Sequence, residues 1–184
     1  MLARKTLIVA VLIWSCHTVF AECAQRVDMA TYAACLPKGW VFFRDAALDR
    51  LSGCSKLSGK CTGNGGGYPL RGAVFIFLMP ADKVTDHPPY RSPDDIVSAA
   101  PHGGRPAPDI GEVRLIGQGK RCLVARSLLF GRVWDEVYGV EVNGRLFRAW
   151  VQYNNEPGSI DKYRRQIEGI LSSLIPRSAD LDRK

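Results

Sequence analysis

Residues 133–153 read VWDEVYGVEVNGRLFRAWVQY, and this stretch decides the fold of the chain. Asn143 and Gly144 separate two runs rich in valine and aromatic residues, which is a strong signal for a β-hairpin with a two-residue turn. That turn predicts the following cross-strand pairs: Val142 with Arg145, Val140 with Phe147, Tyr138 with Ala149, and Trp134 with Tyr153. One face of the hairpin is therefore predicted to be apolar and aromatic.

Two further strands are expected before the hairpin, at residues 112–116 and 120–130. If Gly131 and Arg132 form a second two-residue turn, the apolar face gains Leu123, Ala125 and Leu129. The opposite face then carries a mixture of apolar and polar side chains: Cys122, Val124, Arg126, Leu128, Asp135, Val137, Arg148, Trp150 and Gln152. We expect that opposite face to be only partly covered.

The last predicted element is an amphipathic helix. Ser159 can cap the start of this helix, and the helix ends before Pro176. Between them, apolar residues recur at helical spacing: Ile160, Tyr163, Ile167, Ile170, Leu171 and Leu174. Such a helix can close over the apolar face of the sheet. The alternative interpretation is a helix that lies on a membrane surface.

The N-terminal half is less regular. Its predicted elements are a polar helix at 22–34, a turn and strand at 36–43, a short helix at 46–51 capped by Asp45, and a Gly/Ser-rich loop at 52–68. Residues 73–79 are apolar on both faces, which predicts an interior strand that ends at Pro80.

Residues 81–110 form a long excursion with six prolines. Ser92 and Pro93 are a typical helix start, so a short helix is expected at 93–99. Long connections with little regular structure are often functional, which makes this segment the first candidate for a binding rim.

The N-terminus has the pattern of a secretory signal. Arg4 and Lys5 precede an apolar run at 7–14, and a small-residue cleavage site ends at Ala21. Eight apolar residues are far fewer than the roughly 20 that span a bilayer. We expect a signal peptide at 1–21, a single domain at 22–176, a polar tail at 177–184, and a secreted or periplasmic location. Lipidation at Cys16 is the alternative.

Composition is that of one globular domain. The chain has 184 residues, of which 46% are hydrophobic and 23% charged, and this excludes a disordered tail, a collagen and a multi-pass membrane protein. The formal charge of +7 falls to +5 without the two basic residues of the signal. Because the remaining lysines and arginines are scattered along the chain, nucleic-acid binding is not expected.

Five of the six cysteines would remain after cleavage, and export favours disulfides. Cys54 and Cys61 could form a local bridge, and Cys23 could pair with Cys35 if the chain doubles back. Four cysteines allow three connectivities, so the pairing stays open. Cys122 is left over and is expected to be a buried thiol.

The chain resembles the PsbP-like family in the segment LPKGW at 36–40, in the antiparallel meander, and in the final sequence YRRQIEGILSSL at 163–174. That family includes the extrinsic photosystem II subunit, Mog-type Ran-binding proteins and bacterial exported proteins. The resemblance covers 36–43 and 111–175. It implies an α+β fold in which helices flank an antiparallel sheet (an α/β/α sandwich), the C-terminal helix packs on the sheet, and the domain acts as an accessory or binding module.

Two segments depart from the family pattern, namely 54–61 and 81–110. The N-terminal signal is also a simple secretory one and no thylakoid address. Photosynthetic function is therefore not implied.

Residues with metal-binding chemistry gather in the excursion: Asp86, His87, Asp94, Asp95 and His102. Two imidazoles and three carboxylates could hold a divalent cation such as Zn²⁺ or Mn²⁺. Alternatively, acidic residues in the first turn of a helix simply stabilise that helix. With Tyr90, these residues are the candidate binding residues of the chain.

Patterns of catalysis are weak. The sequence has no Gly-x-Ser-x-Gly motif, and cysteine stands where a phosphate-binding loop needs serine or threonine, at Cys61. Glu136 could act as an acid if burial raised its pKa, although a paired carboxylate is the commoner case.

We therefore expect a non-catalytic accessory or binding module of the bacterial cell envelope that needs no cofactor. It would bind an envelope protein through 81–110 and the adjoining sheet edge. The alternatives are a metal-dependent envelope hydrolase that uses the Asp/His group and a secreted inhibitor or effector held by disulfides. Whether the chain has enzyme activity stays open.

Overall fold

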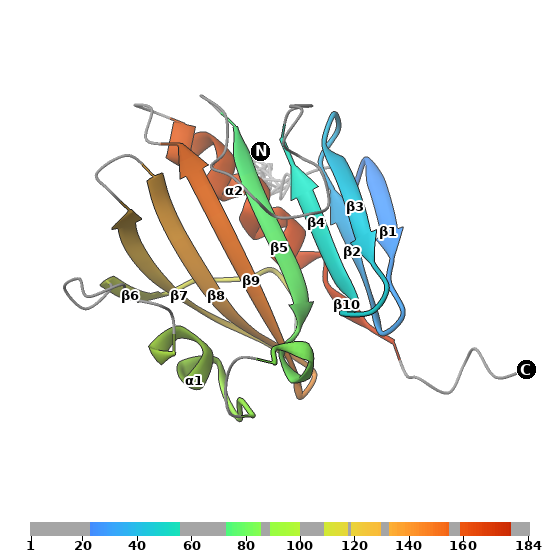
Figure 1. Ribbon diagram of the computed structural model, residues 1–184, viewed down its shortest axis with the longest axis vertical. Helices are drawn as coiled ribbons and strands as arrows, with labels where there is room; N and C mark the ends of the chain where they lie inside the picture. Colours follow the sequence, from blue (N-terminus) through green and yellow to red (C-terminus); the bar gives the residue numbers. More distant parts are fainter. Residues whose placement is uncertain are drawn as a thin grey trace, which may run out of the picture.

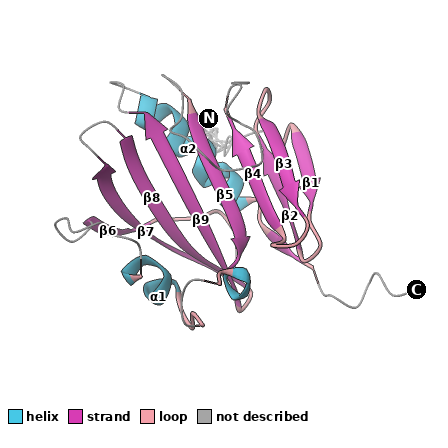
Figure 2. Ribbon diagram, in the orientation of Figure 1, coloured by secondary structure: helices cyan, strands magenta, loops and turns pink. Residues whose placement is uncertain are grey.

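The computed structural model describes residues 23–55, 73–85, 89–99, 109–117, 119–129, 133–154 and 159–177. Two antiparallel sheets and two α-helices make up these parts of the chain (Figures 1 and 2). The expected antiparallel sheet with flanking helices is confirmed to this extent: in these ranges the fold is mostly antiparallel β-sheet with two α-helices. Within these ranges, neither helix has the length and apolar character needed to cross a bilayer.

The larger sheet has seven strands in the order β3-β4-β5-β9-β8-β7-β6. Their bounds are β3 Val41–Asp45, β4 Arg50–Cys54, β5 Val74–Pro80, β6 Asp109–Glu112, β7 Lys120–Leu129, β8 Val133–Val142 and β9 Arg145–Asn154. The smaller sheet has the order β1-β2-β10, with β1 Gln25–Asp28, β2 Tyr32–Leu36 and β10 Ile175–Pro176. The helices are a short 3₁₀ helix η1 Ala81–Lys83, α1 Pro93–Ser98 and α2 Ser159–Ser172.

The hairpin of β8 and β9 is confirmed in every predicted pair, from Val142 opposite Arg145 to Trp134 opposite Tyr153. Asn143 and Gly144 both adopt positive φ, at 50° and 78°, which is the backbone geometry of this class of two-residue turn. The strand predicted at 73–79 and its end at Pro80 are also confirmed, because β5 runs from Val74 to Pro80 in the middle of the sheet.

The register of β7 differs from the prediction by one residue. Leu129 pairs with Val133, so three residues and not two lie between the paired positions. A shift of one residue turns every side chain to the other face. Cys122 and Val124 therefore pack in the apolar core, while Leu123 and Ala125 lie on the opposite face.

The helix predicted at 22–34 is wrong, since that segment is the hairpin of β1 and β2. The N–H groups at its turn find an acceptor far away in the sequence, because the Asp49 carboxylate accepts from the backbone N–H of Ala30 at 2.8 Å and of Thr31 at 3.0 Å. The Thr31 hydroxyl also donates to Asp49, at 2.5 Å. Nothing local in the sequence announces this arrangement.

The helix predicted at 46–51 is also wrong. Asp45 does accept from the Leu48 N–H, at 3.3 Å, but the chain turns there and returns as β4 instead of continuing as a helix. The strand expected at 112–116 lies earlier, as β6, and β10 was not anticipated. Ser52 to Cys54, expected in a loop over 52–68, belong to β4, and residues 56–68 lie outside the described residues.

The main core lies between one face of the large sheet, α2 and the small sheet. Its largest fully buried side chains include Tyr32, Phe147 and Ile167, and the Trp40 indole N–H donates to Gln166 of α2 at 3.0 Å. This confirms the prediction that the C-terminal helix packs on the apolar face of the sheet. Arg177, just after β10, donates its backbone N–H to Thr31 at 2.8 Å and so ties the end of the described chain to the small sheet.

A second core lies on the opposite face, beneath α1. Ile96 and Val97 of α1 pack there on Ala125 and Val137. Gly139 permits this close approach, because a Cβ at this position would lie 2.4 Å from the backbone carbonyl oxygen of Pro93. The predicted helix start is confirmed, since Ser92 and Asp95 form a complete capping box around the first turn of α1.

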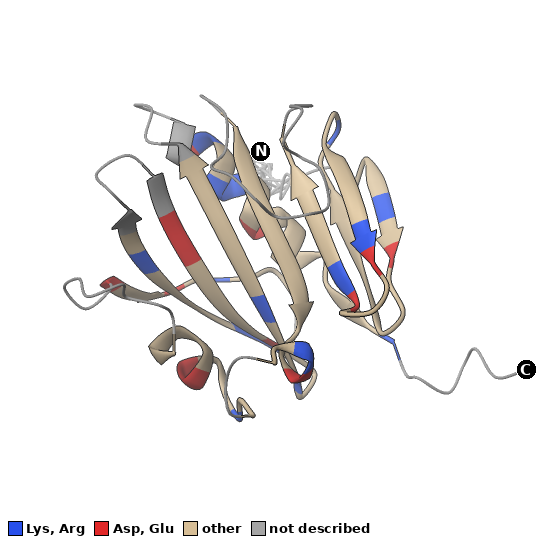
Figure 3. Ribbon diagram, in the orientation of Figure 1, with Lys and Arg blue, Asp and Glu red and all other residues tan. Residues whose placement is uncertain are grey.

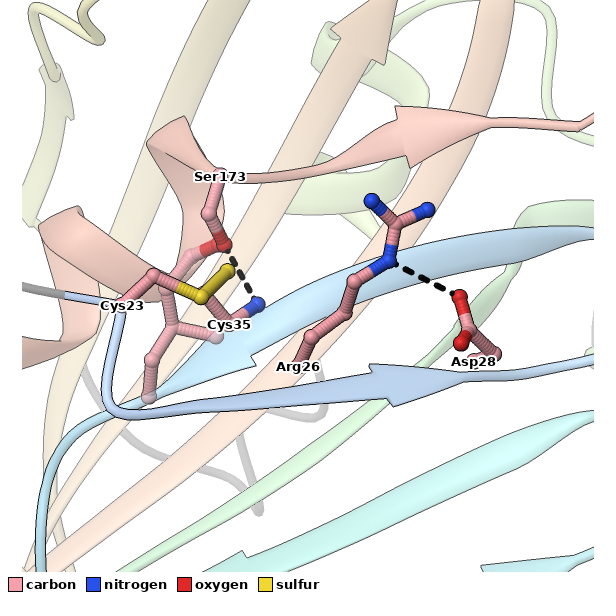
Figure 4. Close-up of a disulfide and its surroundings, with 6 residues drawn as sticks. Cys23, Arg26, Asp28, Cys35 and Ser173 are labelled. Atoms are coloured by element: carbon pink, nitrogen blue, oxygen red, sulfur yellow. Dashed lines mark hydrogen bonds and ion pairs between the residues drawn. A yellow bond between two sulfur atoms is a disulfide. The ribbon is translucent and has the colours of Figure 1, made fainter.

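The disulfide between Cys23 and Cys35 joins β1 to β2 (Figure 4). It confirms one of the open pairings. The backbone N–H of Cys35 donates to the Ser173 hydroxyl just after α2, at 2.8 Å, so the bridge sits where the hairpin meets the helix. Cys54 is disulfide-bonded as well, while its predicted partner Cys61 lies outside the described residues. Cys122 is a free, buried thiol, as expected.

Candidate functional site: a basic cleft on the open face of the sheet

The face of the sheet that carries α1 is covered over β7 and β8 and hollowed over β4, β5 and β9. The hollow has a volume of about 300 Å³, and we call it the basic cleft. Its walls come from the turn before β4, from β4, β5 and β9, and from η1 with the residues that follow it: Leu48, Arg50, Phe77, Met79, Lys83, Val84, Thr85, Arg148 and Trp150. A volume of this size is at the lower end of small-molecule sites.

Two aromatic rings form part of the wall. Phe77 of β5 and Trp150 of β9 are directly opposite each other in the sheet. Their ring centroids are 5.6 Å apart with 33° between the planes, so the two rings pack against each other. Met79 and Arg148 form the next pair on the same face, which places a cationic side chain beside this apolar surface.

Three cationic side chains line the cleft, and they differ in how their charge is balanced. Arg50 donates to the Asp45 carboxylate at 3.0 Å, and its guanidinium carbon lies 5.7 Å from the centroid of the Phe77 ring. Within the described part of the chain, no carboxylate pairs with Lys83 or Arg148. Basic positions on β4, β9 and η1 lie toward the same end of the sheet (Figure 3).

Arg148 has a further unmet requirement. Its Nε is buried from water and has no hydrogen-bond partner. A buried donor without an acceptor costs about 1–3 kcal/mol. Arg50 also has an unpartnered buried Nε, but its Nη2 is held by Asp45. The cleft therefore combines uncompensated positive charge with an aromatic wall, which suits an anion that carries an apolar group.

The candidate binding residues of the excursion are only partly described. Asp94 pairs with Arg121 at 3.1 Å, and Asp95 accepts the backbone N–H groups of Arg91 and Ser92 in the capping box. Tyr90 packs against the core beneath α1. Asp86, His87 and His102 lie outside the described residues. Among the described residues, no three metal-binding side chains come together, and both aspartates serve the alternative role of stabilising α1.

Glu136 lies on the opposite, covered face of the sheet, and only 1% of it is exposed. Its Oε2 accepts from the Tyr138 hydroxyl and, at 2.8 Å, from the Tyr153 hydroxyl. Its Oε1 accepts from Arg126 at 3.0 Å and from Arg164 of α2 at 3.2 Å. Burial and the Glu136 charge raise the pKa of Tyr153 well above its usual value, so this phenol stays a donor.

This arrangement explains what the buried carboxylate does. Glu136 is paired, the commoner case for such a residue, and it joins β7, β8 and β9 to α2. Its four donors all belong to the protein, and α2 covers it. The acid of a glycoside hydrolase must reach the substrate. This geometry therefore does not support such a role for Glu136.

Sequence reasoning placed part of the cleft correctly. Arg148 and Trp150 were predicted on the partly covered face, and Lys83 lies at the start of the excursion proposed as a binding rim. Arg50 was missed, because its segment was taken for a helix and a loop. The alternating pattern of β9 was the available signal, since it puts a basic and an aromatic residue on a face that no element was predicted to cover.

No protein-family model matches the chain, and a search of curated proteins finds no significant match.

Proposed function

We propose that this chain is an exported, non-catalytic binding module of the bacterial cell envelope, and that it binds an anionic envelope component in the basic cleft. The observation that carries the proposal is the cleft itself, in which Lys83 and Arg148 have no carboxylate partner among the described residues and lie beside the rings of Phe77 and Trp150. Lys83 belongs to the first residues of the segment 81–110, so the binding rim expected from the sequence and the cleft meet there.

Export is proposed on two grounds. The N-terminal residues 1–21 have the pattern of a secretory signal, and Cys23 pairs with Cys35 just beyond the proposed cleavage site. Disulfides form and persist in oxidising compartments such as the periplasm. We propose a signal peptide at residues 1–21, a single domain at 22–176 and a polar tail at 177–184.

For the fold we propose the α/β/α sandwich of the PsbP-like family. The placement of α2 over one face of the large sheet and α1 over the other supports this proposal. The small sheet of β1, β2 and β10 and the segment 81–110 would be additions to the family pattern. In that family the domain serves as an accessory or binding module, which agrees with a binding site that needs no catalytic group.

The test compares charge reversals in the mature chain. Shortening 81–110 would be a poor test, because Ile96 and Val97 of α1 are core residues. Lys83→Glu instead changes an exposed residue of the cleft, and Arg165→Glu makes the same kind of change on the exposed side of α2. Each variant is cross-linked in envelope extract and purified at low and at high salt.

We expect the native chain and the Arg165→Glu variant to capture the same anionic component, and the Lys83→Glu variant not to capture it. High salt should release this component. Capture that is equal for all three chains would mean that binding does not use the cleft. Absence of any salt-sensitive component with the native chain would overturn the proposed function. Cleavage after Ala21 is checked by the intact mass of the exported protein.

A further inference from the structure

The cleft contains more information than a positive charge, because its two halves differ in chemistry. On one side, Phe77 and Trp150 present an aromatic surface at the wall of an open hollow. On the other side, Arg148 and Lys83 provide donors that pair with no carboxylate in the ranges the structure describes. A ligand that satisfies both sides needs an anionic group and a flat apolar group in the same small molecule or residue.

A carboxylate is an anionic group that fits these donors. A guanidinium presents its N–H groups in a planar fork that matches the two oxygens of a carboxylate. Arg50 in the same cleft already donates to the Asp45 carboxylate through Nη2, at 3.0 Å. Arg148 has the same side chain and, among the described residues, no carboxylate partner. An incoming carboxylate would meet the terminal Nη groups of Arg148, because the Nε of this arginine is buried from solvent.

The flat group follows from the neighbouring wall. Phe77 and Trp150 are both half-buried, although each belongs to a central strand whose other face is fully covered. Aromatic rings pack favourably on other flat rings at centroid separations of about 4.5–7 Å. The rings also fix orientation, because a group that stacks on them directs its carboxylate to the adjacent row of the sheet, where Arg148 lies.

We infer that the basic cleft binds an aromatic carboxylate, with its carboxylate on Arg148 and Lys83 and its ring against Phe77 and Trp150. This inference rests on the proposed function and gives the chemistry of its ligand. The same chemistry has two sources, namely a free aryl acid or the C-terminal aromatic residue of a polypeptide. The volume of about 300 Å³ limits the bound part to a group of this size.

The test is calorimetric titration of the mature chain with four probes. 2-Naphthoate represents a free aryl acid, N-acetylphenylalanine represents a chain terminus, 2-naphthamide is the uncharged match of the first, and inorganic phosphate is an anion without a ring. We expect at least one of the two carboxylates to bind about tenfold or more tightly than both the amide and phosphate. The tighter of the two identifies the source.

Variants locate the binding site. Arg148→Gln removes the charge and keeps a polar side chain. We expect this variant to bind the carboxylate probe about tenfold or more weakly than the native chain. Lys83→Gln, at an exposed position, tests the same site if Arg148→Gln fails to fold. Arg165→Gln on α2 is the matched control and should leave the affinity unchanged.

Several results would overturn the inference. If 2-naphthoate and 2-naphthamide bind with equal affinity, the carboxylate has no role in binding. If phosphate binds with the same affinity as the aromatic carboxylates, the ring has no role. Affinity that is unchanged in both Lys83→Gln and Arg148→Gln would place the ligand elsewhere. If none of the probes binds while Lys83→Glu still loses its envelope component, the ligand chemistry is wrong and the proposed function stands. If neither is observed, both are wrong.

Discussion

Glu136→Gln removes the charge that joins β7, β8 and β9 to α2 and leaves the shape of the side chain almost unchanged. The carboxylate is 1% exposed and accepts four hydrogen bonds, two from tyrosine hydroxyls and two from arginines. A glutamine can turn its oxygen to the arginines and donate its NH₂ to the tyrosine oxygens. The contacts can therefore re-form with the direction reversed at the tyrosines, whose own O–H groups lose their acceptor, so the loss combines that of the negative charge and of this acceptor.

The magnitude follows from the exposure of the two arginines. Removing one partner of a buried ion pair costs about 3–5 kcal/mol, because a charge is left without compensation. The side chains of Arg126 and Arg164 are 23% and 31% exposed, so water can partly solvate them when Glu136 is neutralised. We therefore expect the lower end of that range, about 3 kcal/mol of unfolding free energy, which is a large part of the stability of a typical domain.

Urea unfolding followed by circular dichroism measures this loss. Glu141→Gln is the matched control, since it makes the same chemical change in the same strand at a half-buried residue without an ion pair, and it should change stability by less than about 0.5 kcal/mol. Equal midpoints for the two variants would refute the argument. So would a Glu136→Gln protein as stable as the native chain.

Three further changes test the packing of the fold. Gly139→Ala should lower the unfolding free energy measured in urea by about 1–3 kcal/mol, because the added Cβ would lie 2.4 Å from the backbone of α1. Gly111→Ala is the control and should cost less, because its Cβ would lie 3.2 Å from a flexible arginine side chain. Equal losses for the two variants would contradict the close approach of α1 to Gly139. Replacing Cys23 and Cys35 by serine should lower the unfolding free energy by about 2–3 kcal/mol, since the bridge closes a short loop with a separation of 12 residues, and an unchanged midpoint would count against this. Burial raises the pKa of the Cys122 thiol to about 12, so at pH 8 the thiolate is scarce and iodoacetamide should label this cysteine only after unfolding; rapid labelling of the folded chain, read by mass, would show an open core.

The elements that could be predicted from the sequence are those with local causes. Asn143 and Gly144 determine both the turn and the register of β8 and β9, because only a few turn types join two strands through two residues. Ser92, Pro93 and Asp95 likewise contain the whole start of α1 within four positions. The hydrophobic periodicity of α2 identified both the helix and its buried face.

The errors have non-local causes. No clear local signal tells whether two or three residues connect β7 to β8. The one additional residue shifts the register of β7, so Leu123 and Ala125 lie on the face that carries α1 and not on the face that carries α2. The hairpin of β1 and β2 depends on Asp49, which lies 18 positions after Thr31. β10 has two residues and exists because it pairs with β2. A local pattern contains none of these contacts.

The cleft was predictable in part for the same reason. Alternation along β9 places Arg148 and Trp150 on one face. That Arg50 and Lys83 lie beside them depends on the strand order β4-β5-β9, in which neighbours in space are far apart in the chain. Sequence alone could therefore identify two members of the site, and the topology was needed to bring the others to them.

The two faces of the large sheet treat charge in opposite ways, and the difference supports a binding role for one of them. On the covered face, the protein supplies Glu136 for Arg126 and Arg164, and α2 closes over the group. On the open face, Asp45 is paired with Arg50, but among the described residues no carboxylate pairs with Arg148 or Lys83. An unpartnered buried Nε does not distinguish Arg148, because Arg50 and Arg164 each have one as well as a carboxylate partner. What distinguishes Arg148 is that its charge has no such partner within the parts of the chain that the structure describes. A chain that leaves this position unpaired is better suited to receiving its anion from outside.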